Sequence, residues 1–149
     1  MDIEHEIKQK AFKSVYHKVI VNLYYTANQF RGKENVVFKK HGLSAQQFNV
    51  LRILRGQYPH PCSLLTIRER MLDKDSNASR LVDKLVAAQL VDRNICPMDR
   101  RQVDICINEK GLELLELINP LIDDLHKNEL GLTEAEAIQL SNLLDKMRS

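Results

Sequence analysis

Five polar residues between positions 76 and 84 have the types and spacing of a surface that contacts DNA. Short hydrogen-bonding side chains come first and two cations follow one turn apart: Ser76, Asn77, Ser79, Arg80 and Lys84. Short side chains let a helix backbone approach base edges in the major groove, and Lys and Arg neutralise phosphates. An ordinary solvated helix start is the alternative for the first three. An ion pair with Asp83 or Asp99 is the alternative for Arg80.

A second basic cluster follows at the tip of a predicted hairpin. Arg100 and Arg101 adjoin Asp99, whose carboxylate we expect to pair with one guanidinium group and hold it extended. Arg93 precedes them on the strand that leads into the tip. Arginine at the end of a hairpin suits the narrow, electronegative minor groove, so we predict that this cluster contacts DNA beside the first one.

The sequence offers no recognisable catalytic constellation. GxSxG, P-loop and GxGxxG motifs are absent, and the chain contains only five glycines. The five histidines lack metal-ligand spacing, and paired carboxylates such as Asp123 and Asp124 fall on a predicted outer helix face. We therefore expect no enzyme, no bound metal and no other cofactor.

The net charge of +2 hides an uneven distribution. Residues 1–108 contain 18 Lys and Arg against 11 Asp and Glu, a balance of +7, whereas the rest of the chain stands at −5. A basic body with an acidic tail favours a polyanionic partner for the body. At 149 residues with 44% hydrophobic side chains, the chain is long enough for one buried core, so a single domain over residues 1–149 is predicted.

The chain has no feature of a membrane or secreted protein. No stretch approaches the ~18 apolar residues of a membrane span, and the charged opening lacks a signal-peptide core. Cys62, Cys96 and Cys106 are odd in number without a CxxC pair, which fits reduced thiols and a cytoplasmic location. A peroxide-sensing thiol at Cys62 is an alternative, although no cationic neighbour obviously lowers its pKa.

Hydrophobic periodicity predicts the elements that position the two clusters. Ser44 and Gln47 form a capping box before a helix that stops at Pro59, and a short helix follows over 64–72. Apolar residues at steps of three and four then leave the first polar cluster on the outer face of a helix. Alternation predicts two antiparallel strands, over 91–96 and 102–108, joined by a tip at 97–101.

Long helices are predicted at both ends. An apolar stripe runs through the first thirty residues, and a basic connector over 31–42 follows it. A second stripe begins beyond Gly111, and a capping box of Thr133 and Glu136 opens a closing helix. A long opening helix without a helical neighbour in sequence needs a partner surface.

The order helix, short helix, helix, hairpin, helix over 44–130 describes a winged helix-turn-helix, so the fold class is mainly α with a small β-hairpin wing (α+β). The stretch SRLVDKLVAAQLVDRNICPMDRRQVDICINEKG resembles the core signature of the MarR (multiple antibiotic resistance regulator) family. The matching pieces are residues 79–85, 89–93, 99–101 and 103–111. LSAQQFNVL and LTEAEAIQLSNLLDKM resemble two further family helices, so the resemblance covers about residues 40–149.

The resemblance implies a homodimeric transcriptional regulator, with repression as the expected sign. Residues 1–40 and 109–149 would supply long dimerisation helices, and residues 44–108 a lobe that binds double-stranded DNA at a pseudo-palindromic operator. It also implies a small phenolic or anionic ligand that lowers DNA affinity. Candidate lining residues, for which core packing is the alternative, are Tyr16, Tyr24, Phe48, Leu51 and Arg52.

Departures from the family pattern gather before the recognition helix. The turn reads LDKDSN, where we expect Asp73 or Asp75 to cap the helix. Ala78, Gln89 and Asn108 replace the commoner Val, Gly and Thr. Carboxylates beside a recognition helix repel phosphates unless they turn away from the DNA. The acidic residues Asp73, Asp75 and Asp83 therefore favour one alternative, a winged-helix dimer that binds another protein and no DNA.

Overall fold

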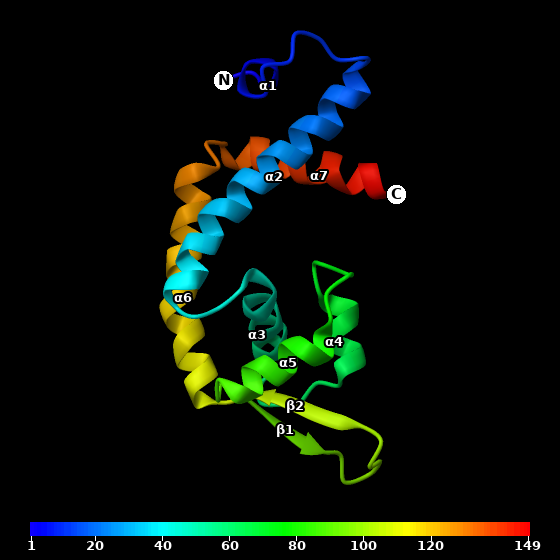
Figure 1. Cartoon of the computed structure of the whole chain (residues 1–149), viewed down its shortest axis with the longest axis vertical. Helices are drawn as coiled ribbons and strands as arrows, with labels where there is room; N and C mark the ends of the chain where they lie inside the picture. The colour runs from blue at the N-terminus through cyan, green and yellow to red at the C-terminus, as the bar shows by residue number, and fades with distance from the viewer.

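The computed structural model describes residues 1–149 as seven helices and one antiparallel hairpin, and it confirms the predicted fold class (Figure 1). Helices α1 and α7 and the first half of α2 occupy one end, the hairpin with α3, α4 and α5 occupies the other, and α6 runs from the hairpin to α7. The elements are α1 (Ile3–Glu6), α2 (Val15–Lys40), α3 (Ala45–Gln57), α4 (Leu64–Arg70), α5 (Ala78–Ala87), β1 (Val91–Ile95), β2 (Val103–Ile107), α6 (Glu109–Glu129) and α7 (Glu134–Arg148).

Helix α2 begins and ends later than the sequence predicted. It starts after Ser14, whose Oγ accepts the backbone N–H of His17 at 3.1 Å, and the preceding residues form only α1 and an irregular segment. It then continues through residues 31–40, so the prediction of a connector there was wrong. Gly32 lies inside this part of α2. A glycine inside a helix lowers helix stability by only about 1 kcal/mol, and tertiary contacts offset that loss here.

Those contacts join the second half of α2 to α3 and α6. The ring of Phe38 packs on Phe48 with centroids 4.6 Å apart. Lys33 pairs with Glu129 at 2.5 Å, and Glu34 pairs with His126 at 2.6 Å. The apparently basic connector is therefore one side of a helix pair, and α2 carries the lobe on a rigid arm.

The predicted local signals in the lobe are confirmed. Ser44 and Gln47 make the capping box of α3, with the Ser44 N–H donating to Gln47 Oε1 at 2.8 Å and the Gln47 N–H donating to Ser44 Oγ at 3.1 Å. Thr133 and Glu136 do the same for α7. These reciprocal bonds satisfy backbone groups that a helix start leaves without partners.

The hairpin has the register that its alternation predicts. Val91 lies opposite Ile107, and Ile95 lies opposite Val103. Ile105 and Ile107 are buried and Val103 is half-buried, so one face of β2 joins the core. Cys62 pairs with Ile105 from the other side through two backbone hydrogen bonds of 2.7 and 2.8 Å, which ties the base of the hairpin to the start of α4.

One hydrophobic core connects the lobe to its supporting helices. Nineteen buried residues form a continuous cluster that includes Phe38 of α2 and Leu115, Ile118 and Ile122 of α6. Helix α6 and the lobe therefore share one packed core, and no solvated linker separates the two.

Large apolar side chains remain exposed on the helices outside this core. Helix α7 buries no residue, and α2 buries only Phe38. Tyr16 and Tyr24 on α2 are 80% and 64% exposed, and Leu143 on α7 is 53% exposed. Exposed apolar side chains on two helices are typical of surfaces that contact another chain. No helix in the structure combines the length and hydropathy needed to span a membrane.

Gly111 is required where α6 starts beneath the lobe. A Cβ atom built on it would lie 2.3 Å from the carbonyl oxygen of Leu90 and 2.7 Å from Cγ1 of Ile107. We expect Gly111→Ala to lower the free energy of unfolding by about 2–3 kcal/mol, because the backbone of the turn at Leu90 must move. Urea unfolding measures this loss. Gly56→Ala is the control, since no atom lies within 4 Å of its added Cβ, and an equal loss in both variants would refute the packing argument.

Candidate DNA-binding site

Asn77, rather than an aspartate, caps the recognition helix α5. Its Oδ1 accepts the backbone N–H of Arg80 at 3.0 Å, so the prediction that Asp73 or Asp75 would cap the helix was wrong. Asp73 instead accepts the N–H of Asp75 and closes the turn before the helix. The side-chain oxygen of Asn77 is occupied by this capping hydrogen bond. Its Nδ2 group can still donate to another acceptor.

The outer face of α5 carries most of the first predicted cluster. Ser79, Arg80 and Lys84 are exposed, and Arg80 takes part in no salt bridge, so neither predicted alternative partner is used. Ser76 differs from the rest, because its Oγ is shielded from solvent and has no hydrogen-bond partner. Its contact with a base remains a prediction that requires the side chain to rotate.

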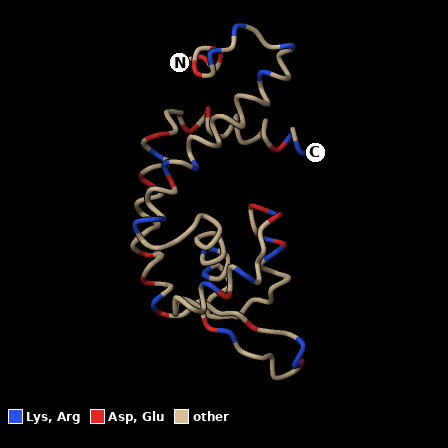
Figure 2. Tube along the Cα trace, viewed as in Figure 1, with Lys and Arg blue, Asp and Glu red and all other residues tan.

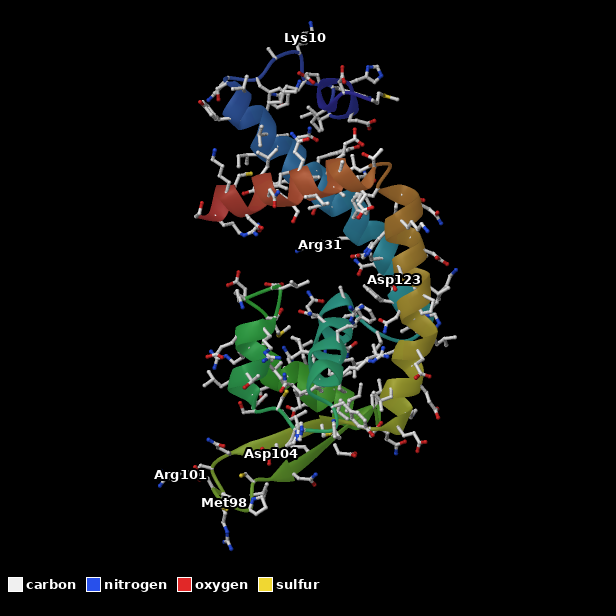
Figure 3. The ribbon with its side chains drawn as sticks, turned by 180° about the vertical axis from the view of Figure 1, so that it is seen from behind. Lys10, Arg31, Met98, Arg101, Asp104 and Asp123 are labelled. Carbon is white, nitrogen blue, oxygen red and sulfur yellow. The ribbon has the colours of Figure 1, made fainter.

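Asp99 shapes the tip of the hairpin through backbone contacts. Its Oδ1 accepts the backbone N–H of Arg101 at 2.9 Å, and the N–H of Gln102 donates to its carbonyl oxygen at 3.0 Å. The expected pairing of its carboxylate with an arginine side chain was therefore wrong. Both arginines are exposed and take part in no salt bridge. Basic residues lie at the free end of the hairpin (Figure 2), and Figure 3 shows Arg101 there.

An ion pair joins the recognition helix to the hairpin. The Arg93 guanidinium on β1 contacts the Asp83 carboxylate on the outer face of α5. Both side chains are partly exposed, so the pair adds less than about 1 kcal/mol to stability. Its value is as a marker of geometry, since it shows that the outer face of α5 and β1 lie side by side. Sequence reasoning missed this role of Asp83, although the residue lies one helical turn beyond Ser79.

Two substitutions at Asn77 separate its capping role from its expected contact with DNA. Asn77→Ala removes the cap, so we expect a loss of about 1 kcal/mol in stability. Asn77→Asp keeps the acceptor and the stability, but it replaces an amide donor with a carboxylate that phosphates repel. DNA affinity should therefore fall in the order wild type, Asn77→Ala, Asn77→Asp. Thermal unfolding and duplex titration measure the two properties, and an Asn77→Asp variant of undiminished affinity would remove Asn77 from the interface.

The structure brings together only part of the predicted ligand-binding set. Phe48 and Leu51 are buried in the core, and the Arg52 guanidinium lies 5.7 Å above the Phe48 ring. Tyr16 and Tyr24 are exposed near the other end of α2. Phe48 packs on Phe38, which lies fourteen positions after Tyr24 on α2. At the rise of an α-helix this separation corresponds to about 21 Å along the helix axis. One cavity lined by all five residues would need a second chain, and this assignment stays a prediction.

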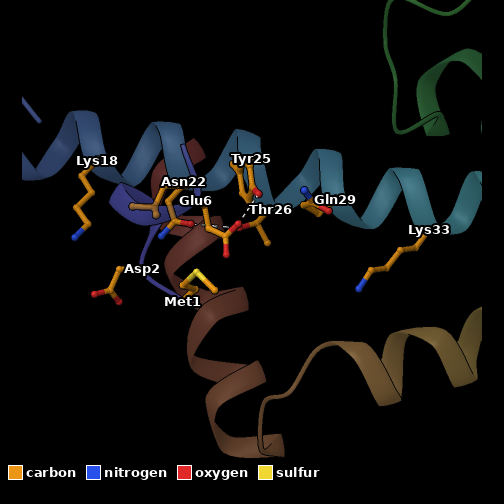
Figure 4. A pocket seen from close by; sticks show the side chains of 10 residues that line it. Met1, Asp2, Glu6, Lys18, Asn22, Tyr25, Thr26, Gln29 and Lys33 are labelled. Atoms are coloured by element: carbon orange, nitrogen blue, oxygen red, sulfur yellow. Dashed lines mark hydrogen bonds between the residues drawn. The ribbon is translucent and has the colours of Figure 1, made fainter. Parts of the chain in front are cut away.

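Two hollows in the surface are lined by other residues. The first, of about 480 Å³, lies between the N-terminal segment and α2, where Tyr25 Oη donates to Glu6 at 2.9 Å (Figure 4). The second, of about 500 Å³, lies between the loop after α2 and the first turns of α6. Lys110 at its edge donates to the carbonyl oxygen of Ala88 at 3.2 Å, at the end of α5. No group of three or more metal-ligating side chains occurs in the structure.

The cysteines near the hairpin are poorly placed for oxidant sensing. Cys62 is only 3% exposed, and burial raises the pKa of its thiol. Burial also raises the pKa of Cys106, which lies opposite Asp92 rather than opposite Cys96. A raised pKa lowers the thiolate fraction at neutral pH, and the thiolate is the species that reacts.

We expect iodoacetamide to modify Cys62 and Cys106 slowly at pH 7 and much faster at pH 9. The thiolate fraction rises as pH approaches the raised pKa of each thiol, whereas a thiol with a lowered pKa would already react at its full rate at pH 7. Mass spectrometry of the alkylated peptides gives both rates. In parallel, peroxide should leave the DNA affinity of the wild type and of Cys62→Ser unchanged. Rapid pH-independent alkylation of Cys62 would support the oxidant-sensing alternative.

Together, a capped polar helix, an arginine-tipped hairpin and the ion pair between them define a winged helix-turn-helix DNA-binding protein. Comparison with known proteins gives the same class. A family model described as MarR family matches residues 43–103. The HTH-type transcriptional regulator MhqR of Bacillus subtilis is 37% identical over 81 residues, and this match spans 54% of each chain.

Two solved structures extend the similarity to nearly the whole chain. A MarR transcription factor from Planctomyces limnophilus is 30% identical, with 93% of this chain and 98% of that chain covered at a TM-score of 0.70. Bordetella bronchiseptica BpsR, whose DNA binding is regulated by 6-hydroxynicotinic acid, is 25% identical, with 92% and 94% covered at a TM-score of 0.78. The chain belongs to the MarR family, and it is a transcription factor rather than an enzyme.

Proposed function

We propose that the protein acts in the cytoplasm as a homodimer that binds a pseudo-palindromic DNA operator and represses transcription. Residues 44–108 form the DNA-binding lobe, and residues 1–40 and 109–149 supply the dimerisation helices. The exposed apolar surfaces of α2 and α7 support the assignment of the second role, because they have no covering element within the chain. Two lobes related by a two-fold axis would read half-sites about 10 bp apart.

The observation that carries the DNA-binding assignment is the contact between Arg93 and Asp83. It places the outer face of α5, with Ser79, Arg80 and Lys84, beside the hairpin that carries the two free arginines. A recognition helix in the major groove then directs the hairpin tip towards the neighbouring minor groove. In this proposal the exposed residues Ser79, Arg80 and Lys84 of α5 and the two arginines at the tip contact DNA from one side of the lobe.

A small anionic or phenolic effector is proposed to weaken DNA binding. BpsR, which has the same fold, is regulated by 6-hydroxynicotinic acid. In this chain α6 belongs both to the core of the lobe and to the proposed dimerisation arm. A ligand that moves α6 would therefore change the distance between the two recognition helices of a dimer, and only one distance fits successive major grooves.

Selection of bound duplexes from a random library tests the proposal. The expected product is a symmetric sequence whose affinity falls steeply with salt, because each phosphate contact releases counterions. Titration of the winning duplex between 50 and about 200 mM salt supplies the slope. Failure to enrich any sequence, together with no binding to random duplex at low salt, would leave the alternative of a winged-helix dimer that binds another protein.

A further inference from the structure

Two apolar side chains lie exposed at the end of the hairpin, away from the helices that await a dimer partner. Met98 is 93% exposed and Ile95 is 66% exposed. Met98 lies at the free end of the hairpin with Arg101, beyond the body of the lobe (Figure 3). Ile95 pairs with Val103 in the hairpin, but most of its side chain and nearly all of Met98 face solvent.

The tip displays Met98 on a closed turn. The Cys96 N–H donates to the Gln102 carbonyl at 3.0 Å and extends the ladder beyond β1 and β2. The Gln102 N–H donates in turn to the Asp99 carbonyl, also at 3.0 Å. Pro97 restricts the backbone before Met98. Met98 therefore lies within a turn that these two backbone hydrogen bonds close.

We propose that Met98 enters the minor groove of bound DNA as an apolar contact, while Arg100 and Arg101 meet the phosphates and groove edges beside it. This inference rests on the proposed function. Minor-groove proteins use apolar wedges of this type together with flanking cations. The Met side chain is flexible enough to follow the walls of a groove.

The size and charge of the tip favour DNA over a protein partner. Two apolar side chains bury far less than the area that a stable protein interface requires, roughly 1,200 Å² in total. The adjacent arginines have no acidic partner within the chain, so they retain their full attraction for phosphate. In a DNA groove an apolar side chain can contact the sugars that form the walls, and two adjacent cations can contact the phosphates along the edges.

The contact would add sequence preference at base pairs that flank the major-groove half-sites. Pyrimidine–purine steps such as TA and CA unstack and kink at low cost, so they accept a wedge more readily than stiff steps do. Met98 is therefore a specificity-determining residue for the flanks, whereas α5 determines the half-sites.

The test compares Met98→Ala, Met98→Leu and Arg101→Ala with the wild type on the duplex that the wild type selects from a random library. We expect Met98→Ala to weaken binding about tenfold, because two apolar contacts are lost per dimer, and to leave the salt dependence unchanged. Met98→Leu should stay within about twofold of the wild type, since a volume-conserving exchange keeps the contact. Arg101→Ala should reduce the salt dependence. All three should keep the wild-type unfolding temperature, because the side chains are exposed.

Repeated selection with Met98→Ala supplies the second readout, and the preference at flanking positions should disappear while the half-sites persist. Wild-type affinity in Met98→Ala, with Arg101→Ala weakened, would refute the wedge and leave the proposed function intact. An equal loss in Met98→Leu, or a reduced salt dependence in Met98→Ala, would also refute it. A wild type that binds no duplex would overturn both proposals.

Discussion

Leu143→Glu should convert the dimer into a monomer that has no measurable affinity for the operator. Leu143 lies on α7, which buries no residue within its own chain, and its side chain is 53% exposed. In a two-fold dimer the substitution places two unpaired carboxylates in an apolar interface, and each buried charge costs several kcal/mol. Light scattering at micromolar protein concentration gives the mass.

The loss of DNA binding follows from the loss of the second lobe. A dimer adds a second half-site contact at an effective concentration in the millimolar range, so a monomer forfeits most of the affinity. Asn142→Glu is the matched control, because it adds the same charge at an exposed polar position of α7 that lies away from the apolar face carrying Leu143. It should remain a dimer that binds DNA. A Leu143→Glu variant that stays dimeric, or a monomer that binds the operator at wild-type strength, would contradict the assignment of α7.

Arg101→Ala is the substitution with the second largest expected effect. Its guanidinium is unpaired at the tip, because Asp99 binds the backbone N–H of Arg101 instead of its side chain. A dimer loses two such contacts, so operator affinity should fall about a hundredfold at low salt. The slope of log affinity against log salt should become shallower by about 2, since the counterions of two phosphates are no longer released.

Lys10→Ala is the matched control for this loss of charge. Lys10 lies at the opposite end of the molecule from Arg101 (Figure 3). Net charge changes by the same amount, but affinity and salt dependence should stay close to those of the wild type. An equal effect of both variants would mean that only the overall charge of the protein attracts DNA, and the tip would lose its assigned role.

The lobe was predictable because its signals are local. The capping box at Ser44 depends on residues three positions apart, and the alternation of Val103, Ile105 and Ile107 reports one buried face directly. Such patterns follow from backbone geometry at short range, and they survive in the fold because nothing at longer range opposes them.

Two of the errors arose where distant residues decide the structure. The continuation of α2 through Gly32 depends on Phe48, Glu129 and His126, none of which is near in sequence. The cap of α5 was a local error: Asp73 and Asp75 were the expected caps, but Asp73 closes the preceding turn and Asn77 caps the helix. The Asp83–Arg93 pair needed the angle between helix and hairpin, which no local pattern contains.

Methylation interference on the selected duplex tests the central claim most directly, because dimethyl sulfate modifies guanine N7 in the major groove and adenine N3 in the minor groove. If two lobes each place α5 in a major groove and the hairpin in the adjacent minor groove, N7 methylation should block binding in two half-sites about 10 bp apart. N3 methylation should block binding in the flanks on both sides. Interference confined to a single unpaired site, or at N7 without any at N3, would contradict the account.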